Sequence, residues 1–382
     1  MTLRFVSRLY YLIVFLFVIV LTIIWMKSSR PSIDLAERLP NNGVNEPFDI
    51  DSEGEDLFKN GNFPSFLAHD TFVILIQVHD RLHYLKYLID SLNQVIGIEK
   101  SLVIFSFDTK NLNILNYINQ STKFNYINIF FPCAINPTEN YIQALKKSSL
   151  ISIKHHWSWK ISYVMESLRL KSSFIGYVLL LEEDYIVSPD ILVFMKSLIE
   201  KVENKNEDHF LVLGTFKYHE DVYPYGYGID SFEENLGLAL SYTTFQTLVK
   251  YSKSFCEYDD YNWDFSLINL SERVLPNRFK IYRSIFTRVQ HIGNCGVHAK
   301  STNCESLGKI KQLFSLWSNL NHKDGISDIK VVFNEYNLYK YRNTGGYGGW
   351  SGYNPHLCMK YFKISTLISS TRESTCLELE HL

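Results

Sequence analysis

The sequence predicts an α/β fold built on a doubly wound, mostly parallel β-sheet. Short apolar runs alternate with helical patterns from Thr71 onward, which is the arrangement that strand–helix–strand units produce. The runs are apolar at almost every position, as expected of parallel strands buried on both faces. Hydrophobic residues make up 46% of the 382-residue chain and aromatic residues 15%, which is enough for a large core.

The predicted strands, in chain order, are residues 72–78, 102–107, 126–131, 174–181 and 210–214. After the first strand, a stripe of apolar residues at helical spacing predicts a helix; its members are Leu85, Leu88, Ile89 and Leu92. A second helix is expected at roughly residues 156–170. Ser188 followed by Pro189 is typical of the N-cap and first turn of a third helix.

The N-terminus indicates a membrane anchor. Residues 9–26 are apolar and uncharged, and as a helix they would span about 27 Å, close to the thickness of a hydrocarbon core. A cleaved signal peptide is the alternative, but no small-residue cleavage site follows. We therefore expect a cytoplasmic tail at residues 1–8, a transmembrane signal anchor at 9–26, a stem at 27–66 and a lumenal domain at 67–382.

The charge and the cysteine content limit which binding partners and which cellular compartment are expected. The net charge is -2 and no polybasic block is present, so nucleic acid is not an expected partner. The six cysteines include no CxxC pair, which argues against a zinc module. Their even number behind an anchor suggests disulfides in an oxidising lumen. Asn119 and Asn269 each begin a glycosylation sequon, which fits such a compartment.

Polar residues follow three of the predicted strands, at the edge where open α/β sheets bind their ligands. They are residues 77–81, Asp108 and the consecutive carboxylates Glu182, Glu183 and Asp184. The carboxylates have a plain interpretation as a solvated turn. Alternatively, a divalent cation such as Mn²⁺ neutralises them, with one imidazole and a bound diphosphate completing the coordination. No GxxxxGK[ST] loop is present, so a P-loop is excluded.

A second acidic cluster is YDDYNWD at residues 258–264. If the stretch after Asp260 is helical, Asp260 and Asp264 lie on one face. A carboxylate beside aromatic rings can be desolvated, which raises its pKa toward that of a general base. The alternative is that Asp259 or Asp260 caps a helix beginning near Tyr261. Spacing alone does not choose the base.

Three more features have both a functional and a structural interpretation. His291 lies before a glycine, and a lone histidine is more often structural than a metal ligand. KHHWSWK at 154–160 suits an anionic or sugar ligand, and equally a helix with its Trp residues turned inward. The glycine-rich residues 343–352 indicate a loop that approaches a partner closely or moves.

Six segments occur in a family order: ILIQVHDR at 74–81, KHHWSWK at 154–160, LEEDYIVSPD at 181–190, YDDYNWD at 258–264, HIGNCG at 291–296 and GGYGGW at 345–350. Together they resemble glycosyltransferase family 16, the Golgi β-1,2-N-acetylglucosaminyltransferases of N-glycan synthesis. The resemblance implies a GT-A fold and a single-pass type II Golgi membrane protein. It also implies Mn²⁺-dependent, inverting transfer of GlcNAc from UDP-GlcNAc to O2 of the α-1,6-arm mannose of N-glycans on glycoproteins.

The resemblance also assigns roles to residues by position. The general base would be Asp264, and the Mn²⁺ ligands would be Asp184 and His291. The UDP-GlcNAc site would comprise Gln77, Val78, His79, Asp80, Arg81, Asp108, Ser152, Ile153, Lys154, His155 and His156. Implied disulfides pair Cys256 with Cys358 and Cys295 with Cys304, leaving Cys133 and Cys376 unassigned.

Two departures from the family pattern keep alternatives open. Asp80 stands where the family has Asn, and the segment at 132–153 is shorter than expected. The chain could therefore be a related Golgi GlcNAc-transferase with a different mannose acceptor. A non-catalytic Golgi glycan-binding protein of the same fold is the alternative from another class, although all three implied catalytic and metal residues are present. The sequence leaves homo-oligomer formation open.

Overall fold

The computed structural model describes residues 71–216, 223–231, 234–293, 307–318, 320, 329–336, 346–350, 352, 354–365 and 375–381. These residues belong to one unit, Glu55–Leu382. The predicted tail, anchor and stem, residues 1–66, lie outside the described residues. No helix within the described ranges is long and apolar enough to cross a membrane.

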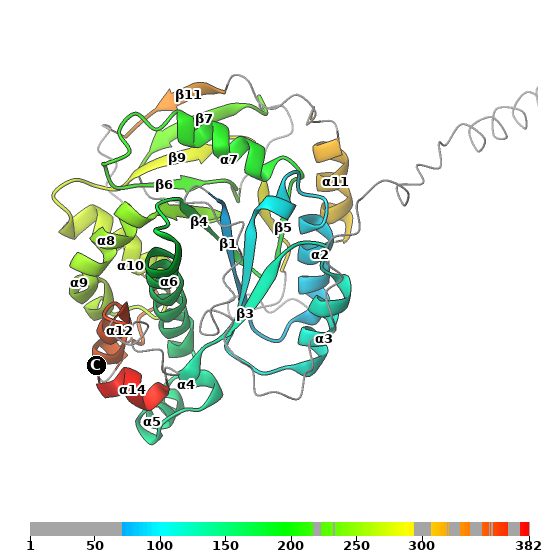
Figure 1. The fold of residues 1–382 in the computed structure, drawn as a ribbon. Helices are drawn as coiled ribbons and strands as arrows, with labels where there is room; N and C mark the ends of the chain where they lie inside the picture. The colour runs from blue at the N-terminus through cyan, green and yellow to red at the C-terminus, as the bar shows by residue number, and fades with distance from the viewer. Residues whose placement is uncertain are drawn as a thin grey trace, which may run out of the picture. The chain divides into compact units, whose positions relative to one another are not determined.

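Within these ranges, nine strands form one sheet in the order β11-β7-β9-β6-β8-β4-β1-β2-β3 (Figure 1). Strands β3, β2, β1 and β4 run parallel to one another, and so do the pairs β6–β9 and β7–β11. Only β4–β8, β6–β8 and β7–β9 are antiparallel among the described pairs of this sheet. The predicted mixed α/β architecture with a mostly parallel sheet is confirmed.

The strand bounds are β1 (Val73–Val78), β2 (Leu102–Phe107), β3 (Tyr126–Phe130), β4 (Tyr177–Glu182), β6 (His209–Val212), β7 (Gly226–Asp230), β8 (Leu238–Ser241), β9 (Lys280–Ser284) and β11 (Lys330–Asn334). All five predicted strands are present, and β7, β8, β9 and β11 were not predicted. These four are only four or five residues long, and β7 carries two glycines, so they lack the long apolar run that marks β1.

Helices cover both faces of the sheet. Alternate residues of β1 point to opposite faces: Val73 and Leu75 join one core cluster, while Ile74 and Ile76 join the other. The first cluster also contains residues of α6 (Ile151–Ser172), α8 (Tyr242–Lys250), α9 (Ser252–Glu257), α10 (Trp263–Asn269) and α12 (Asn354–Tyr361), several of which gather on one side in Figure 1. The second contains residues of α2 (Leu82–Leu92), α3 (Leu112–Ser121) and α7 (Ile191–Glu200).

The remaining elements are shorter or lie at the periphery. A separate two-stranded antiparallel ribbon joins β5 (Tyr185–Val187) to β10 (Val289–His291). The other helices are α4 (Pro132–Ile135), α5 (Glu139–Lys147), α11 (Leu307–Ser318), α14 (Cys376–His381), a 3₁₀ turn at Ile98–Lys100 and a π-helical turn at Leu270–Val274. Residues of α11 form a third apolar cluster with Tyr84 of α2 and Ile186 of β5.

Helix α6 begins earlier than predicted. It starts at Ile151 rather than near residue 156, and almost every side chain from Lys154 to Leu168 is buried. The sequence pattern did not reveal this start because Lys154 and His155 look like surface residues. Both are in fact fully buried, Lys154 against backbone carbonyls and His155 among aromatic rings.

The predicted N-cap at Ser188 is wrong, because α7 begins at Ile191. Ser188 instead donates to the carboxylate of Asp190 (2.7 Å), and Arg288 donates to the other oxygen of that carboxylate (3.0 Å). Arg288 is fully buried over the ring of Phe194, so its charge requires this partner. The Ser188 hydroxyl is therefore part of a buried ion pair rather than a helix cap.

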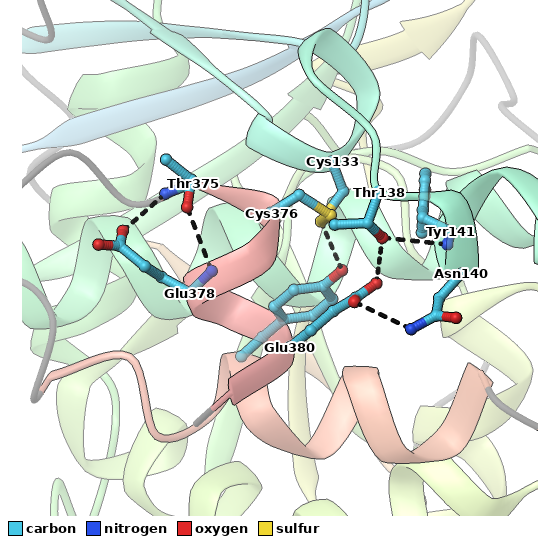
Figure 2. Close-up of a disulfide and its surroundings, with 9 residues drawn as sticks. Cys133, Thr138, Asn140, Tyr141, Thr375, Cys376, Glu378 and Glu380 are labelled. Atoms are coloured by element: carbon cyan, nitrogen blue, oxygen red, sulfur yellow. Dashed lines mark hydrogen bonds between the residues drawn. A yellow bond between two sulfur atoms is a disulfide. The ribbon is translucent and has the colours of Figure 1, made fainter.

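Two disulfides fasten the C-terminal helices. Cys256 of α9 is bonded to Cys358 of α12, which confirms the implied pairing. Cys133 of α4 is bonded to Cys376 of α14, a pair that the sequence left unassigned (Figure 2). Beside this second bond, the carboxylate of Glu380 accepts hydrogen bonds from Thr138 and Asn140. The implied Cys295–Cys304 pair lies outside the described residues.

We predict that replacing Cys133 and Cys376 together with serine lowers the free energy of unfolding by about 2–5 kcal/mol, because the bond closes a very long loop in the unfolded chain. Urea unfolding without reductant measures the loss. The Cys256/Cys358 double serine variant is the matched control. Its loop is shorter, 102 against 243 residues, so loop entropy makes its loss smaller by roughly 1 kcal/mol or less. Unchanged stability of the first variant would contradict the pairing.

Candidate active site

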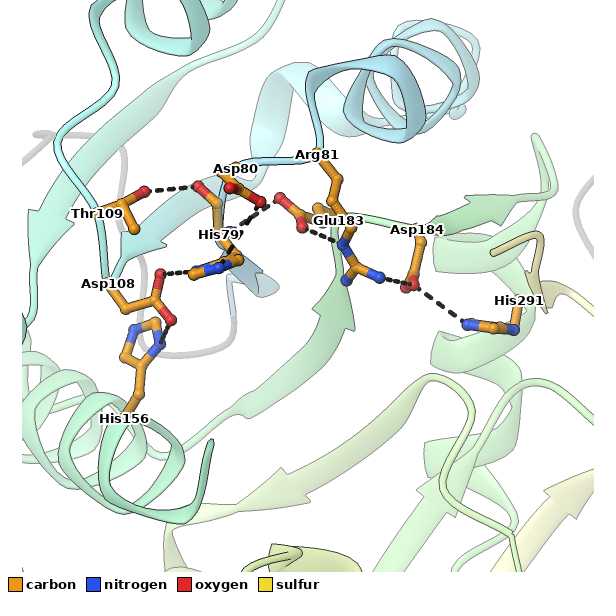
Figure 3. A network of polar contacts seen from close by, with 9 residues as sticks. All are labelled: His79, Asp80, Arg81, Asp108, Thr109, His156, Glu183, Asp184 and His291. Atoms are coloured by element: carbon orange, nitrogen blue, oxygen red, sulfur yellow. Dashed lines mark hydrogen bonds and ion pairs between the residues drawn. The ribbon is translucent and has the colours of Figure 1, made fainter. Parts of the chain in front are cut away.

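The polar residues predicted at the strand ends meet at one edge of the sheet (Figure 3). The parallel register places Gln77 of β1 between Ser106 of β2 and Glu182 of β4. The chain segments that leave β1, β2 and β4 therefore start side by side. This is the edge at which open α/β sheets bind ligands.

Glu183 holds the segment after β1 in place. One of its carboxylate oxygens accepts from the backbone N–H of His79 (2.8 Å), and the other accepts from Nε of Arg81 (2.6 Å). Glu183 is 1% exposed, and it is compensated by this arginine and this N–H. It is therefore a buried support for the loop, and not part of a solvated turn.

His79 and Asp108 form a charged pair. His79 Nδ1 lies 2.6 Å from Asp108 Oδ1, and this hydrogen bond raises the pKa of His79 to about 9. Burial acts to raise the pKa of Asp108, but the hydrogen bond from His79, the charge interactions with His156 and His79 and a backbone hydrogen bond together lower it. Asp80 is exposed beside His79, whereas Val78 points into the core. The pair presents an imidazolium and a carboxylate at the edge of the sheet.

Helix α6 contributes two side chains to this edge. His156 Nε2 forms a hydrogen bond with the Ser106 hydroxyl (2.8 Å), and its Nδ1 lies 3.8 Å from Asp108 Oδ2. Burial lowers the pKa of His156 to about 3 and keeps the ring neutral. One helical turn later, Lys160 donates to the side-chain oxygen of Gln77 (2.6 Å). These contacts connect α6 to the ends of β1 and β2.

The structure does not bring the other α6 residues implied by the resemblance to the same place. Lys154 contacts the backbone carbonyls of Tyr258 and Asp260. His155 lies among the rings of Tyr141, Trp350 and Tyr361. Ser152 bonds a carbonyl in the turn before it, and Ile153 packs against the core.

Asp184 and His291, the implied metal ligands, are brought together by the small ribbon. Tyr185 of β5 pairs with His291 of β10, and His291 Nε2 lies 3.2 Å from Asp184 Oδ2. Arg81 donates to the same oxygen at 2.7 Å. Burial acts to raise the pKa of Asp184, but His291 and Arg81 outweigh it and lower the pKa. The carboxylate is thus held ionised although it is 2% exposed.

Two observations fit a cation at this place. Asp184 Oδ1 is buried and has no hydrogen-bond partner among the described residues, which is costly for a carboxylate oxygen unless a ligand binds it. Gly293 approaches closely: a Cβ there would stand 2.7 Å from Asp184 Oδ2 and 3.1 Å from His291 Nε2, so a larger residue would crowd both side chains. Among the described residues there is no group of three or more His, Cys, Asp or Glu that could hold a metal. Asp184 and His291 could therefore supply two ligands, and a bound substrate or water the rest.

A cavity of about 230 Å³ opens beside this pair, lined by Glu182, Tyr185, Phe216, Asn235, Leu236, Asp264, Ile268 and His291. Asp264 accepts from the Phe265 N–H (2.8 Å) and from Asn235 (3.4 Å). Burial raises the pKa of Asp264 to about 6, which agrees with the expected desolvation. Burial and the charge of Asp184 also raise the pKa of Glu182. The cavity is therefore lined both by a basic carboxylate and by one of the two candidate cation ligands, His291.

The expected common helical face of Asp260 and Asp264 is wrong, and so is the cap near Tyr261. Helix α10 begins at Trp263 with Asn262 at the N-cap position, so Asp260 lies outside it. Asp260 is fully buried and accepts from the N–H groups of Asn262 (2.8 Å) and Gly348 (3.0 Å). Asp259 accepts from the N–H of Trp350 (2.8 Å). Both carboxylates therefore have backbone partners, and Asp264 alone of these three lines the cavity.

Comparison with known proteins identifies the family. Residues 51–142 and 139–358 match the family described as N-acetylglucosaminyltransferase II (MGAT2). The chain belongs to the N-acetylglucosaminyltransferase II family. This confirms the resemblance carried by the six segments.

Individual relatives agree with this membership. An alpha-1,6-mannosyl-glycoprotein 2-beta-N-acetylglucosaminyltransferase of Homo sapiens is 30% identical over 330 residues, which cover 76% of this chain and 73% of the relative. The protein of that name from Mus musculus is 31% identical, covering 76% and 74%. The one from Arabidopsis thaliana is 26% identical over 352 residues, covering 81% and 78%.

Solved structures are more distant. Staphylococcus aureus TarS residues 1–349 in complex with UDP has a TM-score of 0.29 at 13% identity, covering 56% of this chain and 60% of its own. The mannosyltransferase PcManGT of Pyrobaculum calidifontis, in complex with GDP-Man and Mn2+, has a TM-score of 0.33 at 7% identity, covering 63% and 64%. TM-scores this low do not establish a common fold.

Several residues at the site were not predicted. Lys160 lies four residues after His156, so helical spacing would have placed both on one face of α6. Asn235 and Phe216 line the cavity from irregular segments between strands, where no periodic pattern exists. The structure also gives two of the three consecutive carboxylates different places: Glu183 supports the loop and Glu182 lines the cavity.

We predict that Asp264→Asn stabilises the protein at neutral pH. The raised pKa means that folding disfavours the ionised carboxylate, so a neutral isostere should increase the free energy of unfolding by about 1–2 kcal/mol near pH 7.5. The gain should disappear as the pH falls through 6 toward 4, because the wild-type carboxyl then becomes protonated in the folded state as well. Urea unfolding at several pH values measures both effects.

Asp260→Asn is the matched control for this stability change. Asp260 uses its carboxylate oxygens to accept from two N–H groups, and an amide leaves one of those donors facing another donor. This variant should lose about 1–3 kcal/mol. A loss of similar size in Asp264→Asn would mean that the Asp264 carboxylate is not held at a desolvation cost.

Proposed function

We propose that the protein is an inverting glycosyltransferase that moves GlcNAc from UDP-GlcNAc to O2 of the α-1,6-arm mannose of N-glycans. The observation that carries this proposal is the desolvated carboxylate of Asp264 in a cavity shared with Glu182 and His291, in a member of the N-acetylglucosaminyltransferase II family. An inverting transfer needs one base at the attacking oxygen and a separate means of stabilising the leaving group. Asp264 and the Asp184–His291 pair meet these two needs.

The donor nucleotide is assigned to the ends of β1 and β2. His79 and Asp108 present opposite charges there, and Gln77 is held by Lys160. A carboxylate and an imidazolium offer an acceptor and donors, which are what a ribose and a uracil require. In Figure 3, Arg81 and Asp184 lie between this pair and His291, which lines the cavity, so a diphosphate that extends from the nucleoside toward His291 would reach the cavity.

The acceptor side of the cavity is assigned to Asp264. Its carboxylate accepts the proton of the mannose 2-hydroxyl as that oxygen attacks the anomeric carbon of GlcNAc. The bond from that carbon to the diphosphate oxygen breaks in the same step, and UDP leaves with the electron pair. A pKa near 6 leaves Asp264 ionised at neutral pH yet more basic than an ordinary aspartate, which suits a general base.

Mn²⁺ is the proposed cofactor, held by Asp184 and His291. When bound, the cation would supply positive charge against the diphosphate of the leaving group. The protein contributes a buried carboxylate oxygen of Asp184, which has no partner within the described ranges, and the imidazole of His291, which is in register with β5. Arg81 shares the carboxylate of Asp184 and adds a permanent positive charge on the same side.

The proposal extends to fold family and location. We assign the mixed sheet to the GT-A fold, and the protein to the Golgi membrane as a single-pass type II protein with a lumenal catalytic domain. Support comes from the two disulfides, which suit an oxidising compartment, and from the apolar stretch at residues 9–26. Glycoproteins bearing N-glycans would then be its substrates.

The transfer assay is the direct test of this function. The full chain, UDP-GlcNAc and Mn²⁺ should convert a core N-glycan already carrying GlcNAc on its α-1,3 arm, and product analysis should show a new β-1,2 linkage on the α-1,6-arm mannose. The rate should fall as the pH drops through about 6, because Asp264 becomes protonated. Asp264→Asn should lose at least a hundredfold in kcat while binding UDP normally.

Three outcomes would overturn the proposal or a part of it. Equal use of a bare trimannosyl core would favour a related transferase with another mannose acceptor. Absence of both transfer and Mn²⁺-dependent UDP binding would favour a non-catalytic glycan-binding protein. Near-normal turnover by Asp264→Asn would place the base on another residue.

Calorimetry of UDP with and without Mn²⁺ tests the cofactor. UDP should bind at least tenfold more tightly with the metal in the wild-type protein, and this metal dependence should disappear in Asp184→Asn, because a neutral amide oxygen is a weaker ligand than a carboxylate. Asp90→Asn, an exposed position on α2, is the matched control. A metal dependence that persists in Asp184→Asn would assign the cation to other ligands.

A further inference from the structure

Lys154 is a buried lysine whose ammonium binds no side-chain carboxylate among the described contacts. It is 0% exposed, and its Nζ donates to the backbone carbonyls of Tyr258 (3.1 Å) and Asp260 (3.2 Å). The same atom lies 4.5 Å from the ring centroid of Trp350 and 5.1 Å from that of Phe255. Carbonyl oxygens and aromatic faces therefore surround the cation on α6.

The glycine-rich segment at 346–350 also holds the turn at residues 258–260. Asp260 accepts from the Gly348 N–H (3.0 Å), and Asp259 accepts from the Trp350 N–H (2.8 Å). The Trp350 indole N–H in turn donates to the Cys256 carbonyl (2.5 Å). A Cβ on Gly346 would overlap the Asp260 carboxylate, so the approach requires glycine there.

This turn leads directly to the proposed base. Asp260 accepts from the N–H of Asn262, the residue that precedes α10, and Asp264 is the second residue of that helix. One turn after Lys154 on α6, Trp157 stacks on Trp263 with ring centroids 4.9 Å apart and planes 8° apart. Helix α6 therefore holds the start of α10 at two points, one polar and one aromatic.

The position of Lys154 argues against contact with the donor. His156, which lies at the donor edge, follows by two residues, about 200° around the helix. Every contact of the Lys154 ammonium described above is to the 258–260 turn or to the rings beside it. With no exposed surface, it offers nothing to a nucleotide sugar at the ends of β1 and β2.

We propose that Lys154 is a positioning residue for Asp264: it holds the 258–260 turn and so sets where α10 begins and where the Asp264 carboxylate stands. This inference rests on the proposed function, in which Asp264 is the base. A displacement of about 1 Å at a reacting group can lower a rate a hundredfold. Loss of the Lys154 contacts would shift the turn before Asp264 and would therefore lower kcat. Burial lowers the pKa of Lys154 to about 7, against the charges of Asp260 and Asp259, so the site also holds the side chain at a desolvation cost.

The test compares Lys154→Met with the exposed Lys253→Met on α9 in the full chain. Methionine keeps the length and burial of the side chain but removes the donors and the charge. We expect kcat of Lys154→Met to fall roughly 10- to 100-fold, with the KM for UDP-GlcNAc and the affinity for UDP changed less than twofold. The acid limb of its pH profile should also move, because the surroundings of Asp264 change. Lys253→Met should match the wild type.

A second variant perturbs the 258–260 turn through a substitution at an exposed residue rather than a buried one. Asp259 is exposed, and Asp259→Ala removes the acceptor that holds Trp350. It should lower kcat several-fold with the same unchanged donor KM, and Asp259→Asn, which keeps an acceptor oxygen, should recover most of the loss. A purely structural role would lower the thermal midpoint of both alanine and methionine variants without moving the pH profile of the folded fraction.

The outcomes separate this inference from the function on which it rests. If Lys154→Met raises the KM for UDP-GlcNAc and leaves kcat unchanged, Lys154 belongs to the donor site and the inference fails alone. If kcat, both KM values and the pH profile of the folded variant match the wild type, Lys154 serves stability only and the inference also fails. If the wild-type protein transfers no GlcNAc, the proposed function itself fails.

Discussion

Two buried carboxylates, Glu183 and Asp184, follow the half-buried Glu182 at the end of β4, and the candidate active site is arranged around their compensation. Only Glu182 belongs to the strand, while Glu183 and Asp184 form the turn that leads to β5, and each carboxylate meets different partners. Glu183 turns to Arg81 and the backbone after β1, Asp184 turns to His291, and Glu182 faces the cavity. Arg81 contacts two of the three, and its permanent charge makes their burial tolerable.

Helix α6 contacts both the proposed donor site and the segment that carries the proposed base. Its sequence is unusual because polar and aromatic residues are buried around its whole circumference, and each face binds a different partner. One face bears His156 and Lys160 against the ends of β1 and β2, and another bears Lys154 and Trp157 against the segment that carries Asp264. A single helix therefore contacts both the proposed donor edge and the segment that carries the proposed base.

The sequence predicted the parts of the fold that rest on periodicity. The apolar runs of β1 and β4 and the stripe of α2 were confirmed, because burial on both faces or on one helix face leaves a direct trace in residue order. The strands β7 and β9 were missed because they are short and mixed in character. The start of α7 was placed too early, because Ser188 donates to Asp190 and Asp190 pairs with the buried Arg288, 98 residues further along the chain. No local sequence pattern shows these contacts.

The candidate site was predictable where its residues follow strands or lie in family segments. The resemblance assigned roles to Asp184, His291 and Asp264; in the structure Asp184 lies against His291, and His291 and Asp264 line one cavity. The different surroundings of residues 152–156 were not predictable, because a match to a family segment does not show which face of the helix each side chain occupies. The role of Asp260 was also misjudged, since its partners, the N–H of Gly348 and that of Asn262, become visible only in three dimensions.

The ribbon of β5 and β10 has a consequence for folding. It pairs residues that lie about a hundred positions apart, and Asp184 meets His291 only when Tyr185 and His291 are in register. An unfolded chain has no such meeting point, so a ligand that bridges the two side chains binds the native state alone and shifts the folding equilibrium toward it. Contacts this distant in sequence form slowly. The ability to bind such a ligand would consequently appear only late in folding, and a bound ligand would stabilise the native state against unfolding.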